Sequence, residues 1–153
     1  MTREELHNTV LLVHKPAAIT SSDTIGKVKK ILRARKIGHA GTLDMFATGL
    51  LVVCTGVLTK LTRFFLESDK QYAGRVRLGI RTDTDDCQGN VIDTRPAGRI
   101  SDSIISGMTA RFTGPQLQSP PAFSALKVGG SRASDLARKG RAVDLAPRPV
   151  EIR

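Results

Sequence analysis

Two glycines, a histidine and an aspartate lie close together in one short segment of the sequence, residues 36–44. Gly38 and Gly41 allow the backbone to turn tightly and to approach a bound partner closely. A carboxylate beside such a turn, here that of Asp44, can act on a substrate as a nucleophile or as a general base. The segment therefore predicts a site for chemistry on a substrate held against it.

Positive charge surrounds this carboxylate in the sequence. No acidic residue lies between Asp23 and Asp44, where the cationic residues are Lys27, Lys29, Lys30, Arg33, Arg35 and Lys36. The whole chain has 24 Lys and Arg against 14 Asp and Glu, which gives a net charge of +10. This balance favours a nucleic-acid partner held through its phosphates. A soluble basic protein of another kind could carry the same charge, so charge alone does not decide between them.

Composition and motifs argue against several other classes. Aromatic residues make up only 4% of the chain, whereas sequence-blind single-strand binders usually present several stacking rings. Neither GxxxxGK[ST] nor GxGxxG is present, which disfavours a nucleotide-binding phosphate loop. The acidic run at 82–86 lacks the pattern of a calcium loop, so we expect no metal.

The two cysteines and the start of the chain indicate a cellular location. Cys54 and Cys87 form no CxxC pair, and we expect reduced thiols, with Cys54 buried in a strand. The first residues are too acidic and too weakly apolar for a signal peptide, and no apolar run has membrane-spanning length. We therefore expect a cytoplasmic protein.

Apolar periodicity predicts short strands that alternate with amphipathic helices. Strands are predicted at 9–14, 50–54, 72–81, 90–94 and 148–153. Helices are predicted from Ile25, after cap candidates at 20–23, and at 59–66, 101–112 and 131–139. Residues 114–121 are expected to form an extended loop. This order predicts one α+β domain with a mixed, largely antiparallel sheet and flanking helices.

Four blocks of sequence carry a likeness to a known family. They are HKPAAITS at 14–21; KIGHAGTLD at 36–44 with ATGLL at 47–51; KQY at 70–72 with LG at 78–79 and TDTD at 82–85; and QSPPAFSALK at 118–127 with LAR at 136–138. In this order they resemble the TruB family of RNA pseudouridine synthases, which make pseudouridine in the T-arm of tRNA. The resemblance implies a pseudouridine-synthase-like fold and a T-loop uridine of tRNA as substrate.

The resemblance also implies roles for individual residues. Asp44 matches the catalytic aspartate, a nucleophile in an enzyme that detaches uracil from its ribose and reattaches it through carbon. Tyr72 matches a tyrosine that stacks on the target base once that base has left the RNA stack, and His39 matches a histidine lining the same site. Lys15 and Lys70 are candidate phosphate contacts. The resemblance implies no cofactor, no metal and no membrane, and a monomer when the protein is complete.

Each of these residues also has an ordinary interpretation. Asp44 could be a turn or cap residue, as Asp next to glycine often is. Tyr72 alone could be a core or cross-strand residue, and His39 a hydrogen-bonded loop residue. Lys15 and Lys70 could be solvated lysines.

The chain departs from the family pattern at several positions. Met45 and Phe46 follow the aspartate, where the family usually has proline first, and Ala18 stands where glycine is common. The other departures are Val52 for proline, and Phe123 and Ser134 for tyrosines. These departures affect the expected geometry of the loop and some of the expected RNA contacts, but they leave Asp44 and Tyr72 in place.

The family pattern also continues beyond the residues present here. An arginine that pairs with the catalytic aspartate follows in the family, and many members add a PUA domain. We therefore expect residues 1–153 to be the N-terminal portion of a catalytic domain, incomplete at its C-terminus and without a PUA domain. The alternative is a non-catalytic RNA-binding or RNA-folding protein derived from the same fold.

Overall fold

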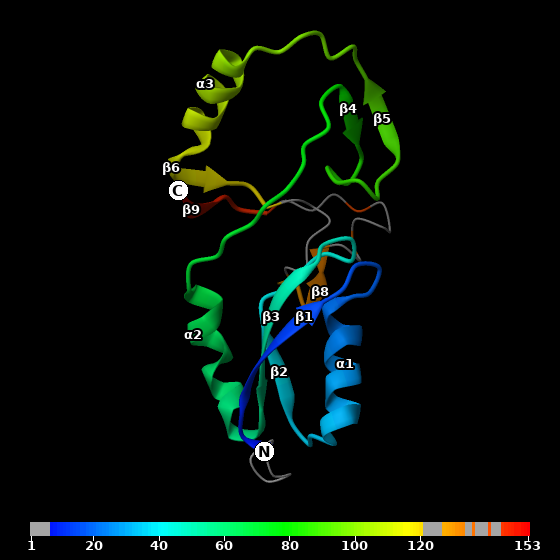
Figure 1. Cartoon of the computed structure of the whole chain (residues 1–153), viewed down its shortest axis with the longest axis vertical. Coiled ribbons are helices and arrows are strands. Elements are labelled where there is room, and N and C mark those ends of the chain that lie inside the picture. Colours follow the sequence, from blue (N-terminus) through cyan, green and yellow to red (C-terminus); the bar gives the residue numbers. More distant parts are fainter. Residues whose placement is uncertain (1–6, 121–126, 134–135, 137–140, 142–144) are drawn as a thin grey trace. The chain divides into compact units, whose positions relative to one another are not determined.

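The computed structural model describes residues 7–120, 127–133, 136, 141 and 145–153 of the 153-residue chain. The chain forms two compact units, residues 1–74 and 75–153 (Figure 1). Helices and antiparallel strand pairs occur in both units, so the predicted α+β class is confirmed. Within the described ranges, no helix has the length and apolar character needed to cross a membrane.

The first unit is built on a three-stranded antiparallel sheet in the order β1-β3-β2. Its elements are β1 (Val10–Lys15), α1 (Ser21–Leu32), β2 (Ile37–Ala40), β3 (Gly49–Thr55), the 3-10 helix η2 (Gly56–Leu61) and α2 (Thr62–Glu67). Alternation along the strands gives the sheet two faces. The predicted strands at 9–14 and 50–54 are confirmed as β1 and β3, and Cys54 is buried in β3 as expected.

Helix α1 covers one face of this sheet. The buried core there consists of Ile25 from α1 with Leu51 and Val53 from β3, and Leu11, Val13, Val28 and Ile37 pack against it. On the opposite face, Gly38 of β2 lies against Thr59 and Thr62 of the η2–α2 segment. The sheet therefore runs between α1 and α2, as Figure 1 shows.

The N-cap of α1 is Thr20, one of the cap candidates at 20–23, and it forms a capping box with Asp23. The Thr20 hydroxyl accepts from the Asp23 N–H at 3.0 Å, and the Asp23 carboxylate accepts from the Thr20 N–H at 3.3 Å. Hydrogen bonds from the Thr20 hydroxyl and N–H lower the pKa of Asp23. Because the pKa is lowered, this contribution to stability is present at neutral pH and is lost as the pH falls through that pKa.

The second unit contains strand pairs and one longer helix. Its elements are β4 (Ile80–Thr82), β5 (Val91–Thr94), α3 (Asp102–Phe112), β6 (Gly114–Gln118), β7 (Lys127–Val128), β8 (Ser131–Arg132) and β9 (Arg148–Ile152). The antiparallel pairs are β4 with β5, β6 with β9 and β7 with β8. The helix predicted at 101–112 and the strands predicted at 90–94 and 148–153 are confirmed.

Several local predictions are wrong. The strand predicted at 72–81 is reduced to β4, because its partner β5 offers only four residues, and Tyr72 lies outside it. Residues 114–118 form β6 rather than a loop, since β9 pairs with them in register. The helix predicted at 131–139 is wrong at its start, where β8 forms; 134–135 and 137–140 lie outside the described residues.

Two further expectations in the first unit also differ. Residues 37–40, interpreted as part of a glycine-rich loop, form the strand β2, because they pair with β3 from Ile37 to Ala40. The predicted helix at 59–66 is present as the end of η2 followed by α2. Two of its apolar side chains, Leu61 and Phe64, are exposed, although an amphipathic helix would bury its apolar face.

The turn between β1 and α1 holds a non-glycine residue in the left-handed region. Ala18 has φ +66°, and its N–H donates to the carbonyl of Met45 at 2.9 Å. A side chain in this conformation costs about 1–2 kcal/mol, a cost that glycine avoids. The hydrogen bond to Met45 is made by the main chain, so glycine would keep it.

We predict that Ala18→Gly stabilises the full-length protein by about 0.5–1 kcal/mol, since relief of the left-handed strain outweighs the added freedom of the unfolded chain. Urea unfolding measures the change. Ala17→Gly, at the preceding exposed position, is the control and should not stabilise. An unchanged or lower free energy of unfolding in Ala18→Gly would contradict the prediction.

Candidate functional site: the loop that carries Asp44

Asp44 lies in the connection between β2 and β3, residues 41–48. The two strands are hydrogen-bonded neighbours, with Ala40 opposite Val52, so the connection is the loop of a β-hairpin. The Asp44 carbonyl accepts from the Ala47 N–H at 3.1 Å and closes a tight turn. The residue is exposed, so its carboxylate is open to a substrate rather than sealed in the core.

The residue before Asp44 is fixed by the first residue of α1. The hydroxyl of Ser21 accepts from the Leu43 N–H at 2.9 Å and donates to the Leu43 carbonyl at 3.1 Å. Ser21 is buried, at 2% exposure, so water competes little for these two hydrogen bonds. The sequence predicts Ser21 only as a cap candidate; its place in the block at 14–21 is the signal for this second role.

The residue after Asp44 is fixed by Lys15, at the end of β1. The Lys15 ammonium donates to the carbonyls of Pro16 at 2.9 Å, Ile19 at 2.8 Å and Met45 at 3.3 Å. These three acceptors match the three donors of an ammonium group. The side chain is fully buried, at 0% exposure, and a buried charge is tolerated when it is hydrogen-bonded in this way.

Lys15 was a candidate phosphate contact, and the structure corrects that interpretation. Its side chain is enclosed, and its donors are taken by main-chain carbonyls of the loop and of the neighbouring turn. A phosphate at the surface would find none of these donors. Lys15 holds two segments together instead.

The contacts on both sides of Asp44 explain one departure from the family pattern. Met45 uses its carbonyl oxygen, which accepts from the Ala18 N–H and from the Lys15 ammonium. Proline also has this carbonyl and lacks only the N–H. Methionine and proline at this position can therefore support the same anchoring of the loop.

His39 lies on β2, opposite Val53 of β3, and is partly buried. Its ring Nδ1 is hydrogen-bonded to the carbonyl of Gly41, the first residue of the loop. Because a carbonyl only accepts, Nδ1 carries the proton, and a neutral ring has Nε2 as its acceptor. The hydrogen bond fixes the ring beside the segment that leads to Asp44.

Lys70 and Tyr72 follow α2 in an irregular segment. The Lys70 ammonium donates to the carbonyls of Leu66 at 2.6 Å and Ser68 at 2.9 Å, which satisfies the C-terminal end of α2. The side chain remains exposed. Tyr72 is also exposed, at 71%, so its ring is not part of a core.

The arrangement favours nucleophilic or base chemistry by a single carboxylate. Asp44 projects from a hairpin loop whose main chain is held on both sides, and His39 is oriented at the base of the same loop. In the described ranges, no group of three His, Cys, Asp or Glu residues could hold a metal ion.

Comparison with known proteins decides the family. The model of the TruB family pseudouridylate synthase N-terminal domain matches residues 29–153, which is more than half of the chain. The chain belongs to this family. One solved structure, a Cbf5-Nop10-Gar1 complex, shares the fold with a TM-score of 0.56 at 24% identity, over 83% of this chain and 33% of that one.

Several relatives are similar over nearly the whole chain. The tRNA pseudouridine synthase B of Gluconacetobacter diazotrophicus is 44% identical over 142 residues, 93% of this chain and 46% of that protein. The tRNA pseudouridine synthase B of Mycobacterium sp. (strain KMS) is 47% identical over 143 residues, which cover 94% of this chain and 48% of that protein. The tRNA pseudouridine synthase B of Methylococcus capsulatus is 44% identical over 143 residues, which cover 94% of this chain and 64% of that protein. The chain thus spans about half the length of the first two.

We predict that Lys15→Met destabilises the full-length protein by about 1–3 kcal/mol, because three carbonyls lose their donor in a buried place. The displaced loop should also lower kcat. Urea unfolding and single-turnover kinetics measure the two effects, with Lys27→Met on the exposed side of α1 as the control. A variant with full stability and kcat but a weaker salt dependence of tRNA binding would instead make Lys15 a phosphate contact.

Proposed function

We propose that the full-length protein is a tRNA pseudouridine synthase that isomerises a uridine of the T-loop, with Asp44 as the nucleophile. The observation that carries the proposal is the exposed Asp44 carboxylate on a hairpin loop whose neighbours Leu43 and Met45 are both anchored. Membership of the TruB family and relatives named tRNA pseudouridine synthase B support this choice.

The reaction moves one bond and consumes no co-substrate. The carboxylate of Asp44 adds to the nucleoside, the bond from ribose to the uracil nitrogen breaks, and a bond from ribose to a uracil carbon forms. The carbon loses its proton and the freed nitrogen gains one, so substrate and product are isomers. Release of the carboxylate restores the enzyme.

The target base must leave the RNA stack before the carboxylate can reach it, at a cost of a few kcal/mol. We propose that Tyr72 stacks on the extruded base, since stacking of a base on an aromatic ring is worth about 1–3 kcal/mol. The exposed ring of Tyr72 leaves a face free for this contact.

Two more residues complete the proposed site. His39, held through Nδ1 by Gly41, offers Nε2 to the same base or ribose. Lys70 can exchange a carbonyl of α2 for a phosphate because its side chain is exposed.

We further propose that residues 1–153 form the N-terminal part of the catalytic domain, and that the protein acts on the T-arm of tRNA in the cytoplasm. The match of residues 29–153 to the family's N-terminal domain supports the first point. The net charge of +10 supports an RNA partner.

We predict that Asp44→Asn in the full-length protein abolishes pseudouridine formation, a loss of at least about 10³-fold, because an amide is not a nucleophile of this kind. Affinity for tRNA should stay within about threefold. Tritium release from tRNA labelled at C5 of uridine measures turnover, and filter binding measures affinity. Undiminished turnover would remove Asp44 from the mechanism. If the parent protein binds tRNA and releases no tritium, it is the RNA-binding alternative.

We predict that Tyr72→Ala lowers turnover by about 10- to 100-fold, since the extruded base loses 1–3 kcal/mol of stacking. Tyr72→Phe keeps the ring and is the matched control, so it should retain most of the activity if stacking is the role. Because the side chain is exposed, neither change should alter the melting temperature by more than a few degrees. Full activity in Tyr72→Ala would refute the stacking role.

A further inference from the structure

A second feature of the first unit lies where β1 and β2 begin and β3 ends. A cavity of about 270 Å³ opens there. Its lining residues are His7, Asn8, Arg35, Lys36, Gly56, Val57 and Lys60. The antiparallel register places Thr55, at the end of β3, opposite Ile37, at the start of β2. The Asp44 loop joins the other ends of these two strands, so the cavity is at the opposite end of the sheet.

The cavity is cationic. Its lining contains the cationic residues Arg35, Lys36 and Lys60 and no acidic residue. Within the part of the chain that the structure describes, the three charged side chains make no ion pair and no hydrogen bond. Three cations held around one cavity repel each other, so an anion placed there would relieve their repulsion.

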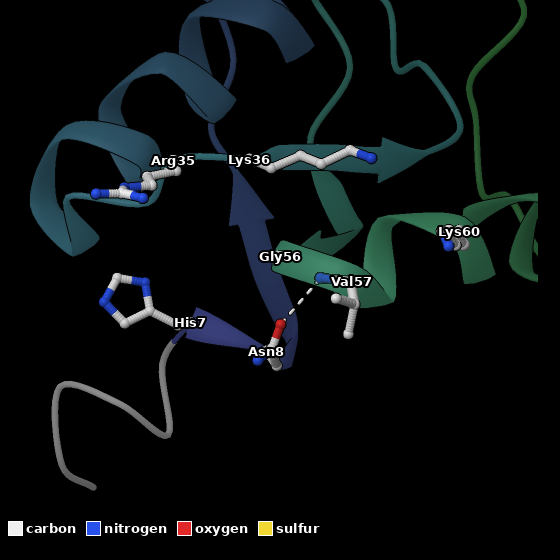
Figure 2. A pocket seen from close by; sticks show the side chains of 7 residues that line it. All are labelled: His7, Asn8, Arg35, Lys36, Gly56, Val57 and Lys60. Atoms are coloured by element: carbon white, nitrogen blue, oxygen red, sulfur yellow. Dashed lines mark hydrogen bonds between the residues drawn. The ribbon is translucent and has the colours of Figure 1, made fainter.

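The wall of the cavity is built from fixed main chain. The Gly56 N–H donates to the carbonyl of Lys36 at 2.9 Å. The Val57 N–H donates to the side-chain oxygen of Asn8 at 2.9 Å, the bond dashed in Figure 2. Gly56 has φ +58°, and a Cβ there would collide with the His7 carbonyl and with the Asn8 side chain. The starts of β1 and β2 are therefore locked to the β3–η2 corner.

The directions of the side chains indicate the shape of the ligand. In Figure 2, His7 and Arg35 extend to the same side of β1, whereas Lys36 extends the other way and Lys60 lies beyond it on η2. Such splayed cations cannot close around one phosphate ion. They suit an extended polyanion, in which successive phosphates lie along the surface. The basic last turn of α1, with Lys29, Lys30 and the C-cap Arg33, leads directly into this region of the chain.

The spacing from Asp44 also fits a long ligand. Strand β3 has seven residues and rises about 3.4 Å per residue, so the cavity and the Asp44 loop are on the order of 20 Å apart. One strand of a DNA duplex advances about 3.4 Å per nucleotide, and the step along an RNA strand is of the same order. An RNA that reaches both places therefore does so with nucleotides several positions apart.

We infer that this cavity binds the phosphate backbone of the RNA substrate, at nucleotides several positions away from the reacting uridine. The inference rests on the proposed function for the identity of the ligand. Contacts to phosphates position the RNA and raise affinity without reading its sequence. Since the cavity is remote from the Asp44 carboxylate, it affects binding and not the chemical step.

The test is the triple variant Arg35→Gln/Lys36→Gln/Lys60→Gln in the full-length protein. We expect Kd for tRNA, measured by filter binding, to rise at least about tenfold near physiological salt, and the slope of log Kd against log salt to fall by about 2. The value of kcat at saturating tRNA should stay within about twofold of the parent.

The matched control is Arg99→Gln/Arg111→Gln/Arg148→Gln, which removes the same charge from exposed residues of the second unit. If both triples weaken binding equally, or the first leaves Kd and the salt slope unchanged, the cavity is not a phosphate site. A parent protein that forms no pseudouridine in tRNA would overturn the proposed function, and with it the ligand inferred here. An active parent whose first triple alone loses affinity supports both.

Discussion

The site depends on the anchoring of the main chain on both sides of Asp44. Ser21 holds the amide and the carbonyl of Leu43, while Lys15 and Ala18 hold the carbonyl of Met45. All three donors lie in the turn between β1 and α1 or at its ends. A carboxylate on a free hairpin loop would sample many positions, whereas this one has its neighbours fixed, which is the pre-organisation that nucleophilic catalysis needs.

The three-stranded sheet separates two opposite electrostatic environments. The Asp44 carboxylate lies on the loop that joins one end of β2 and β3, and Arg35, Lys36 and Lys60 surround the cavity at the other end. The negative group therefore does not weaken the cations that would hold a polyanion. The roles proposed here therefore assign RNA binding and chemistry to different residues of the same small unit, at opposite ends of the sheet.

Much of the first unit could be predicted from the sequence, and the reasons differ by element. The helix cap within residues 20–23 and the apolar strand β3 depend on local chemistry, so both could be predicted. Strand β2 was missed because Ile37–Ala40 has little apolar pattern and is held by pairing with β3. The partners of Lys15 lie up to 30 residues away, and no local pattern reveals that its ammonium is enclosed. The alternation at 72–81 suggested a strand, but a strand also needs a partner of sufficient length. The roles of His39, Lys70 and Tyr72 toward RNA stay predictions.

The loop at 41–48 is held through its peptide groups rather than through its own side chains. It can therefore be transferred to another protein only together with the segment at 15–21 that binds those peptide groups. Residues 41–48 moved alone onto another hairpin would keep the turn between Asp44 and Ala47 but lose the hydrogen bonds that hold Leu43 and Met45. Residues 15–21 would have to travel with them, in the same relative placement, because the lysine, the alanine amide and the serine act from outside the transplanted piece. Most side chains inside the loop could then be substituted without loss of these hydrogen bonds, because the bonds are made by the main chain.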